Sequence, residues 1–512
     1  MAQWSLTRRA NLPYDDTLYE QYVKADRYGN IESEGAAARS AFGEMLSVPV
    51  TPIIQLDPIY GLQDDQYQTF TGGGGTATTT TDSLFQVSST STLGSYGVIR
   101  SRRFLRYRAG QGAMCRITAA FNGNSGSSLR AGLFNQETAL QVGVHNGRFG
   151  ILHSYGGKAE IRILEITAAS TGGTATITVN GTGHNVALVN GETAIQTAAR
   201  IARTLSITGW IIEHKSQYVV FLSESTGSID GTFSYSSTGT STGTFTRTQT
   251  GVTRTDDWIY QEDFNLDKLN GRGPSGMLID VTKLNVFQIN FRWLGAGESR
   301  FAIEDPSTGD MFFFHHIHWS NSNTVPWTHN PNFKIGYVAF NIGGAEAATV
   351  TGASMMGANE GVIAKNDYGR SATVQKSSLA SGTIHHLLSL RNPITENSKI
   401  NTREIILADV SVAHQGNDPL ELFIFLNADL DTGTQIYYQR PESVTVVSTE
   451  TGTLLLTSHT PVASFVTGIN GQQQFDLEPY RITVPAGDTI SIGCRSGQSI
   501  AQVAVASTWL ID

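Results

Sequence analysis

The stretch from Tyr96 to Ile166 begins YGVIRSRRFLRYRAGQGAMCRITAAF and continues through RAGLF to GRFGILHSYGGKAEIRILEI. Its runs of about four to eight residues are rich in β-branched and aromatic types, a pattern typical of antiparallel strands joined by tight turns. A similar stretch, Asp256 to Phe340, contains VFQINFRWLGAGESRFAIEDPSTGDMFFFHHIHW. Neither stretch has enough strands to close a core. We therefore interpret them as two halves of one β-sandwich split by an insertion.

The composition favours sheets and turns over helices. Of the 512 residues, 15% are charged and 53 are glycine. Ordinary soluble domains carry about 25% charged residues, and small hydroxyl residues suit strands and turns. The length allows about three or four domains. The predicted fold class is mostly β: a multi-domain β-sandwich with an inserted small α+β module and a C-terminal β-sandwich.

Charge and targeting patterns argue against several classes of function. The net charge of −9 offers no general basic surface for nucleic acid. Cys115 and Cys494 lie far apart in the chain, so we expect no disulfide framework and assembly in a reducing cytosol. The N-terminal sequence MAQWSLTRRANLPYDD lacks the apolar core of a signal peptide. No apolar run of about 18 residues is present, so we expect no membrane insertion.

Composition shifts divide the chain into five segments. The first, residues 1–65, has scattered tyrosines and an apolar patch but no core of its own, so we interpret it as an N-terminal anchor arm; the alternative is an arm that only covers its own sandwich. Residues 66–82 contain four successive glycines, which are costly to hold in regular structure and predict a linker. The remaining segments are a central sandwich at 83–167 and 251–375, an α+β module at 168–250 and a C-terminal sandwich at 376–512.

Two local signals define the inserted module. The stretch TATITVNGTGHNVALV alternates apolar and polar residues around Asn180-Gly181, which predicts a β-hairpin. The stretch NGETAIQTAARIARTL predicts a helix, and Gly209 follows it as a stop. The apolar stripe at helical spacing consists of Ala194, Ile195, Ala198, Ile201, Ala202 and Leu205.

Three stretches of the chain resemble virion structural proteins of tailed bacteriophages. They begin NLPYDDTLYEQYVKADRYGNIESEG, IRSRRFLRYRAGQGAMCRITAAF and PLELFIFLNADL. The resemblance implies a fibre, baseplate or capsid-associated structural protein, with a central sandwich similar to concanavalin-like or laminin-G-like jelly rolls. It also implies a homo-oligomer, most commonly a trimer, that contacts other virion proteins and is located in the virion after assembly in the host cytoplasm. It brings no catalytic residues with it.

Two groups of residues are predicted to bind partners. The apolar positions of the arm cannot enclose a core among themselves, so they are available to another protein. A basic cluster in SRRFLRYRAG can pair bidentately with the carboxylates of an acidic neighbour, for example a second copy of the chain; a solvated outer face is the alternative. The residues concerned are Ile53, Ile54, Leu56, Ile59, Tyr60, Arg102, Arg103, Arg106 and Arg108.

The densest group of ligand-type residues is His315, His316 and His318. On a strand, His316 and His318 share one face. Two such imidazoles bind zinc when a third ligand comes from elsewhere. No HExxH or CxxC motif accompanies them, so we favour half-buried strand residues and expect neither a metal nor a cofactor.

Other chemical motifs are incomplete. The stretch from Asn427 to Asp431 starts like a calcium loop, but Thr432 and Tyr438 stand where such a loop needs glycine and an acid. Ser241 lies in GTSTG with no helix after it, which does not match a nucleophile elbow. The carboxylates Glu298, Glu304 and Asp305 are candidates for glycoside hydrolysis, but the chain has no fixed-period repeat of the kind found in depolymerising spikes. We therefore expect no enzymatic activity.

A second hypothesis is a host-surface carbohydrate-binding adhesin on the same scaffold, and a glycan hydrolase is a third. The glycan site of the adhesin would use Trp319 and Trp327 on loops at one end of the sandwich. Ordinary core or turn packing is the favoured interpretation of both tryptophans.

Overall fold

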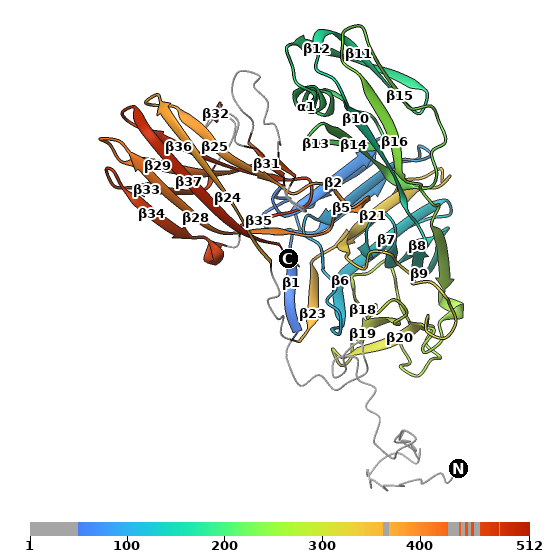
Figure 1. The fold of residues 1–512 in the computed structure, drawn as a ribbon. Helices are drawn as coiled ribbons and strands as arrows, with labels where there is room; N and C mark the ends of the chain where they lie inside the picture. The colour runs from blue at the N-terminus through green and yellow to red at the C-terminus, as the bar shows by residue number, and fades with distance from the viewer. Residues whose placement is uncertain are drawn as a thin grey trace, which may run out of the picture.

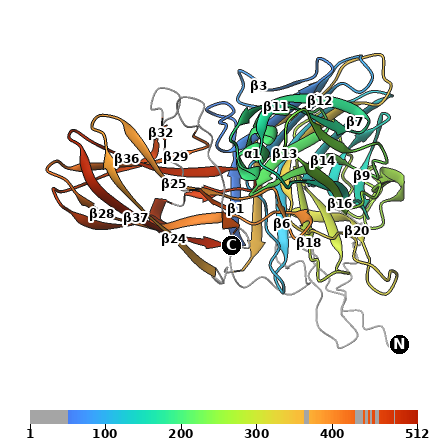
Figure 2. The same cartoon turned by 45° about the horizontal axis from the view of Figure 1, so that its top comes forward.

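The computed structural model describes residues 50–361, 368–428, 440–441, 446–448, 452–454, 461–480 and 482–511. Within these residues the chain forms antiparallel sheets in three units: a central sandwich, an inserted module and a C-terminal sandwich (Figure 1). The predicted class, a mostly-β multi-domain sandwich, is confirmed. Figure 2 shows from a second angle that the C-terminal sandwich (orange to red) extends to one side of the other two units.

One sheet of the central sandwich consists of β1 (Val50–Leu56), β3 (Thr76–Thr79), β4 (Phe85–Ser89), β6 (Ala113–Asn122), β18 (Asn285–Phe291), β19 (Ser299–Glu304), β20 (Met311–Ile317), β22 (Ala348–Gly352) and β23 (Met355–Glu360). Its main order is β20-β19-β18-β6-β22-β4-β3, and β23 lies between β6 and β1. Strand β20 is therefore at one edge of the described sheet.

The facing sheet consists of β2 (Tyr67–Gly72), β5 (Tyr96–Ser101), β7 (Ser127–Phe134), β8 (Ala139–His145), β9 (Arg148–Tyr155), β17 (Thr255–Tyr260), followed by the 3-10 helix η2 (Gln261–Asp263), and β21 (Lys334–Asn341). Its order is β17-β9-β8-β7-β21-β5-β2. Aromatic and β-branched side chains from both sheets fill one core, which includes Phe121, Ile151, Phe287, Phe291 and Trp327. Because β9 pairs directly with β17, the chain leaves and re-enters the sandwich on neighbouring strands.

The inserted module has two small sheets and one α-helix. One sheet consists of β10 (Ala159–Ile166), β13 (Trp210–Lys215), β14 (Tyr218–Thr226) and β16 (Gly243–Gln249), and the other of β11 (Thr171–Val179), β12 (Thr182–Asn190) and β15 (Ser234–Ser237). The predicted hairpin is confirmed: β11 and β12 are joined by Asn180 and Gly181, which take φ values of 50° and 82°. Two successive positive φ values suit the twist of a tight hairpin.

Helix α1 (Ala194–Thr204) confirms the helix expected in the module. Thr193 caps it: its hydroxyl accepts the Gln196 N–H, while the Gln196 side chain accepts the Thr193 N–H, which together form a capping box. Ala198 and Ile201 are buried against strands of the module. Among the described residues, no helix is long and apolar enough to cross a membrane.

The C-terminal sandwich also has two sheets. One contains β24 (Tyr368–Leu379), β28 (Ile405–Gln415), β34 (Gln472–Asp476), β35 (Thr483–Val484) and β37 (Ile500–Ile511). The other contains β25 (Ile384–Arg391), β29 (Leu420–Leu426), β30 (Arg440–Pro441), β31 (Val446–Ser448), β32 (Thr453–Leu454), β33 (Pro461–Thr467) and β36 (Thr489–Ser496). The short hairpin of β26 (Thr395–Glu396) and β27 (Lys399–Ile400) stands apart from both, and a 3-10 helix, η4 (Glu478–Tyr480), follows β34.

The prediction of a linker at residues 66–82 is wrong. Strand β2 pairs with β5, and β3 pairs with β4, so this segment belongs to the sandwich. The glycines between these strands allow the backbone of β5 to pack closely against this connection and do not form a flexible linker. A Cβ atom on Gly75 would overlap the carbonyl of Tyr96, and Gly73 and Gly74 have positive φ.

Several strands lie outside the segments to which the sequence analysis assigned them. Strand β1, expected in the anchor arm, pairs with β23 of the central sandwich. Strand β10, assigned to that sandwich, lies in a sheet of the module, and β24 begins the C-terminal sandwich at Tyr368. The remainder of the proposed arm, residues 1–49, lies outside the described residues.

Candidate functional site

Two of the predicted partner-binding arginines pair with acids of the C-terminal sandwich. Arg102, directly after β5, donates from Nη1 to both carboxylate oxygens of Asp488, at 3.1 and 3.0 Å. Arg103 donates to Glu404 Oε2 from Nη2 at 2.9 Å and from Nε at 3.2 Å. Both acids are buried, whereas the side chains of Arg102 and Arg103 are 19% and 42% exposed, so these are charge-assisted hydrogen bonds to buried carboxylates. The acidic neighbour predicted for Arg102 and Arg103 therefore lies in the same chain.

A buried cationic group lies behind these ion pairs. Lys334 Nζ donates to Gln68 Oε1 at 2.6 Å, and Arg100 Nε donates to the same oxygen at 3.1 Å. Burial is the main reason that the pKa of Lys334 is well below its ordinary value, and the charges of Arg100 and Arg102 add to the effect. Asp488 and Glu404 oppose this shift. Acids of the C-terminal sandwich thus offset the positive charge of this buried group in the central sandwich.

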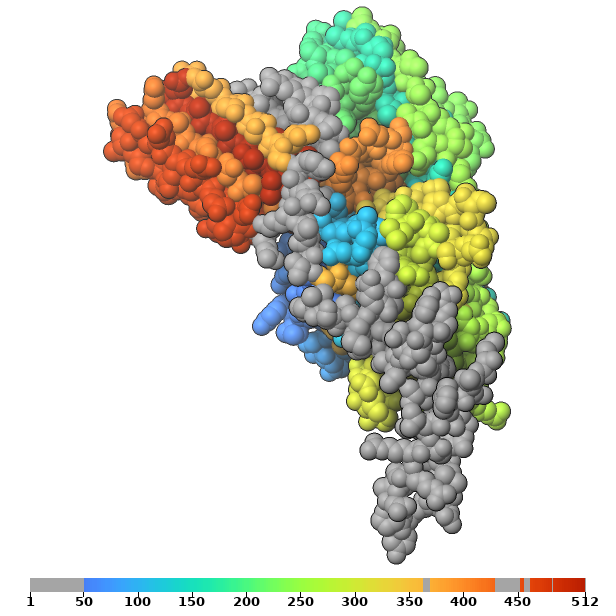
Figure 3. All heavy atoms as spheres, turned by 60° about the horizontal axis from the view of Figure 1, so that its bottom comes forward, coloured from blue at the N-terminus to red at the C-terminus, as the bar shows by residue number. Residues whose placement is uncertain are grey.

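The hairpin β26–β27 extends the contact to the inserted module. Ile394 and Ile400, at its two ends, pack on a buried cluster of the module that includes Ile161 and Leu222. In Figure 3 an orange segment of the C-terminal part lies against the green module. Next to the hairpin, Asn332 Nδ2 of the central sandwich donates to Thr402 Oγ1 at 2.8 Å. Asn330 Nδ2 of the central sandwich also donates to the Ile400 carbonyl at 3.5 Å, so the hairpin contacts both other units.

Glu213 of β13 completes the contact between module and C-terminal sandwich. Its Oε1 accepts the backbone N–H of Ile394 at 2.8 Å, and its Oε2 lies 3.6 Å from Arg391 Nε. Burial raises the pKa of Glu213, and Arg391 and the Ile394 N–H act in the opposite direction. We call this region the three-unit joint, defined by Arg102, Arg103, Glu213, Arg391, Ile394, Ile400, Glu404 and Asp488.

We expect Asp488→Asn to loosen the three-unit joint, because Arg102 and the nearby Lys334 lose a counter-charge. Hydrogen exchange of backbone amides in β5 and β36 should become faster. In a double-mutant cycle with Arg102→Met, urea unfolding should give a coupling energy on the order of 0.5–3 kcal/mol. Asp82→Asn, at an exposed acid in a turn of the central sandwich, is the matched control and should change neither measurement. Strictly additive costs for the Asp488 and Arg102 substitutions would contradict this assignment.

The other predicted partner-binding residues fall into distinct environments. Ile54 and Leu56 are buried in the core of the central sandwich, so these two are not available to a partner, whereas Ile53 packs against the core and is half-buried. Their strand, β1, is held in the sheet by β23, which the sequence analysis did not anticipate. Ile59 and Tyr60, in the turn after β1, are 61% and 85% exposed. Arg106 and Arg108 are half-buried in the segment between β5 and β6.

The two tryptophans suggested for glycan binding are buried in the core. Trp327 stacks on Phe333, with ring centroids 6.0 Å apart, and meets Phe291 edge to face. Trp319 packs on His153 and Tyr155, and its indole N–H donates to the Val325 carbonyl at 2.7 Å. Neither ring offers a face to a sugar, so a glycan site formed by Trp319 and Trp327 is wrong. Burial of aromatic rings stabilises the sandwich instead.

The histidine-rich segment brings three ligand-type side chains together. In β20 an extra residue, Phe314, interrupts the pairing with β19, so that Phe314 and His315 are both buried. His316 then points to the opposite face together with His318, as the sequence predicted. Glu298, just before β19, joins them, and the potential ligand atoms of Glu298, His316 and His318 all lie within 4.8 Å of one another. Burial and then the charge of Arg300 lower the pKa of His316 to about 4, so its ring is neutral at pH 7.

The remaining candidate groups show no catalytic arrangement. Ser241 is buried, and its hydroxyl lies 2.7 Å from the Tyr235 hydroxyl. The Asp305 carboxylate accepts the N–H and hydroxyl of Ser307 within a turn. Glu298 and Glu304 are separated by the length of β19. The candidate calcium loop starting at Asn427 lies mostly outside the described residues, which stop at residue 428 before resuming at 440.

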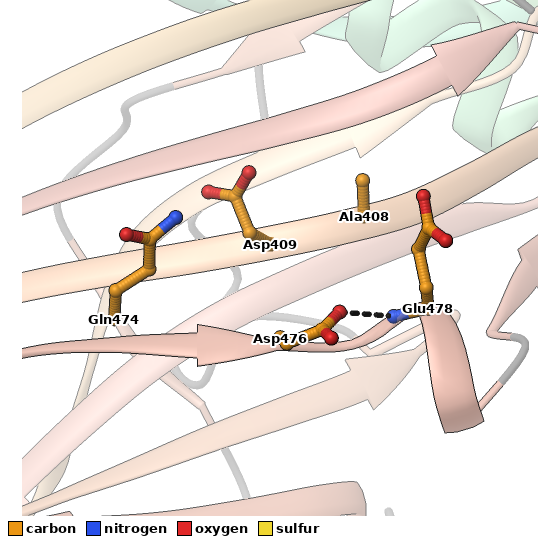
Figure 4. A pocket seen from close by; sticks show the side chains of 5 residues that line it. All are labelled: Ala408, Asp409, Gln474, Asp476 and Glu478. Carbon is orange, nitrogen blue, oxygen red and sulfur yellow. Dashed lines mark hydrogen bonds between the residues drawn. The ribbon is translucent and has the colours of Figure 1, made fainter.

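An open depression of about 420 Å³ lies on the C-terminal sandwich (Figure 4). Its lining includes three acids, and Asp409 and Asp476 face each other as cross-strand partners. Asp476 Oδ1 accepts the backbone N–H of Glu478 at 3.1 Å. Like charges in direct opposition cost stability. The polar side chains of its lining are three carboxylates and one amide, and we assign it no ligand.

Sequence reasoning missed the acidic half of the three-unit joint. Arg102 and Asp488 are 386 positions apart, and Arg103 and Glu404 are 301 apart, so no local pattern links them. The only signal was the unusual density of arginine after β5. Glu298 was noted as a carboxylate, but not as a neighbour of His316 and His318, because that proximity depends on the register of β19 and β20.

Comparisons with known proteins return solved structures of jelly-roll and lectin-like type. Lectin II from Ulex europaeus has 9% identity and a TM-score of 0.22, covering 60% of this chain and 100% of the lectin. The botulinum neurotoxin serotype C1 binding domain has 8% identity and a TM-score of 0.25, covering 87% of this chain and 94% of that chain. A triple jelly-roll protein of an archaeal virus has 7% identity and a TM-score of 0.15, covering 90% of each chain. At these scores the similarities assign no function.

No protein-family model matches the chain, and no curated protein sequence matches it.

Proposed function

We propose that this chain is a structural component of a tailed phage particle, in which it holds three β-units in one fixed arrangement and displays them from the particle. The observation that carries the proposal is the three-unit joint. Its acids Asp488, Glu404 and Glu213 are buried and pair with arginines across unit boundaries, and leaving a buried charge without its partner typically costs several kcal/mol. A joint of this kind suits a protein whose work is mechanical.

The phage assignment rests on the three stretches that resemble virion structural proteins. The proposed partners are other virion proteins and further copies of this chain, with a trimer favoured. The proposed location is the virion, after assembly in the host cytoplasm. We further propose that the chain is not an enzyme and acts as a fibre, baseplate or capsid-associated protein.

The proposed attachment to the particle involves two regions of the chain, one before β1 and one after it. Residues 1–49 are the part of the predicted anchor arm that precedes β1. Ile59 and Tyr60 are the part of the apolar patch that remains exposed once Ile54 and Leu56 enter the core. Adjacent exposed Ile and Tyr side chains offer apolar area together with a hydrogen-bonding tip, which suits a protein contact.

Deleting residues 1–49 tests the attachment. Because β1 begins at Val50, this truncation keeps every described strand, and we expect an unchanged melting temperature together with loss of incorporation into phage particles. Longer deletions would remove β1 and confuse anchoring with folding. The double substitution Ile59→Ser with Tyr60→Ser should also reduce incorporation without altering stability.

Leu93→Ser is the matched control for the double substitution, because Leu93 is 73% exposed in another turn of the same sandwich. It should leave incorporation unchanged. Normal incorporation of the truncated protein into phage particles would contradict the anchoring proposal. A lowered melting temperature without loss of incorporation would support the alternative, that the arm only covers its own sandwich.

The adhesin hypothesis receives no support from the described residues. The tryptophans proposed for it are in the core, and the acidic depression lacks the exposed aromatic rings on which sugars stack. A glycan array probed with the full chain tests the adhesin hypothesis directly. Binding of a defined host glycan would support that hypothesis.

A further inference from the structure

We propose that Glu298, His316 and His318 form a binding site for a divalent transition-metal ion of the zinc type at the edge of the central sandwich. This site is independent of the proposed attachment and of the three-unit joint. It uses two imidazoles and one carboxylate, a ligand set that binds zinc with one position left for water or another ligand.

Strand register places the ligands. Arg300 of β19 pairs with His316 of β20, and Ser299 pairs with Ile317. Extending that register by one residue puts Glu298 opposite His318. Side chains two positions apart share a face of a strand, so Glu298, Arg300, His316 and His318 form a two-by-two array on the same face. The bulge at Phe314 determines which side chains of β20 point to this face of the sheet. Bulges commonly re-aim side chains at functional sites.

One pair of donor atoms already has the separation that coordination requires, and all three donor atoms lie within 4.8 Å of one another. His318 Nδ1 lies 3.3 Å from Glu298 Oε2. Zinc bonds to nitrogen and oxygen of about 2.0–2.1 Å imply tetrahedral ligand separations of about 3.3 Å. His316 Nε2 is shielded from solvent and has no hydrogen-bond partner. A metal ion would satisfy this nitrogen, which otherwise bears an uncompensated cost of burial.

Surrounding residues hold the ligands in position. Arg300 donates to Glu298 Oε1, which leaves Oε2 directed toward His318. Asn265 fixes the backbone of His316 on both sides: its Oδ1 accepts the His316 N–H at 2.9 Å, and its Nδ2 donates to the His316 carbonyl at 2.8 Å. Partners of this kind orient the ligands of established metal sites.

The chemistry of the donors selects the ion. Imidazole nitrogens suit zinc, copper, nickel and iron, whereas calcium and magnesium prefer oxygen ligands. Arg300 and Arg292 place positive charge near Glu298, so binding should be weaker than at a closed site of four protein ligands. His318 is 64% exposed, so the remaining coordination position faces solvent.

The test uses the full chain after removal of metals with a chelator. We expect calorimetric titration with Zn²⁺ to show one site per chain that is weakened at least about tenfold in His318→Ala, since loss of an orienting partner alone weakens metal binding about 10–100-fold. Added Zn²⁺ should raise the melting temperature of the parent protein and not that of His318→Ala. Co²⁺ should give a visible absorption spectrum that the variant lacks.

His184→Ala is the matched control, a partly exposed histidine on β12 of the module, and it should bind Zn²⁺ as the parent does. Equal Zn²⁺ affinity in the parent and His318→Ala would overturn the proposal and leave the Glu298–His318 contact as a simple hydrogen bond. A site that prefers Ca²⁺ would overturn it as well. Glu298→Gln also releases Arg300, so it serves as a second variant that must agree with His318→Ala.

Discussion

Replacing Trp327 with alanine should lower the free energy of unfolding of the central sandwich by about 3–5 kcal/mol, the range for large aromatic residues removed from a core. Trp327 is fully buried and contacts rings on three sides: Phe333, Phe291 and His153. Alanine would leave a cavity that the surrounding strands cannot close, because each is held by its neighbours in the sheet. Urea denaturation followed by tryptophan fluorescence measures the change.

Val325→Ala is the control for this substitution. Val325 lies two positions earlier and is 61% exposed, so its truncation should alter stability by less than about 0.5 kcal/mol. A small effect of Trp327→Ala, similar to that of the control, would show that the indole is not in the core and would reopen its assignment to a surface site.

Acidification should destabilise the protein strongly between pH 6.5 and pH 4, and His153 is the clearest cause. Burial lowers the pKa of His153 from its ordinary 6.5 to about 4. In this interval the unfolded chain binds a proton at His153 and the folded chain does not. The stabilising contribution of the neutral ring is therefore fully present above pH 6.5 and is lost as the pH falls toward 4. Each pH unit changes the folding equilibrium by about tenfold per such histidine.

Other buried groups modify this dependence. Burial also lowers the pKa of His214 to about 3 and of His315 to about 4, so both act in the same direction as His153. Burial raises the pKa of Glu137 and Glu213, and these carboxyls oppose the trend because the folded state retains their protons at higher pH than the unfolded chain does.

Urea unfolding at pH 7 and pH 5 for the parent and for His153→Gln isolates the contribution of His153. The variant cannot take up the proton, so its stability should fall less between the two pH values. Identical pH dependence in both proteins would contradict the assignment, whatever the absolute stability of the variant.

The strands and turns of the fold were predictable because their signals are local. Alternation around Asn180-Gly181 identifies the β11–β12 hairpin, and the spacing of Ala198 and Ile201 identifies α1. The segment from Gly72 to Gly75 shows the limit of that reasoning. Glycine composition is the same for a flexible linker and for a tight strand connection, and only the approach of Tyr96 from β5 distinguishes them.

The candidate sites were predictable only in part, because each combines residues that are distant in sequence. His316 and His318 were recognised from their two-residue spacing, whereas Glu298 becomes their neighbour through pairing of β19 with β20. Arg102 and Arg103 stood out as a cluster, but Asp488 and Glu404 belong to another unit. Ile54 and Leu56 were misassigned because β23, the strand that pairs with theirs and holds it in the sheet, follows about 300 positions later.

The pairing of β1 with β23 has a consequence for synthesis. The Thr51 hydroxyl donates to the Gly361 carbonyl, 310 positions away. At a translation rate of about 5–20 residues per second, roughly 15–60 s pass between the emergence of the two strands. During that time β1 and the edge of β6 that later pairs with β23 have no native partner, although the inserted module, whose contacts are nearer in sequence, can already fold. Slow translation lengthens this interval, and a chaperone that binds unpaired strands protects the chain during it. We therefore expect both factors to affect the yield of folded protein more than the thermodynamic stability of the finished sandwich does.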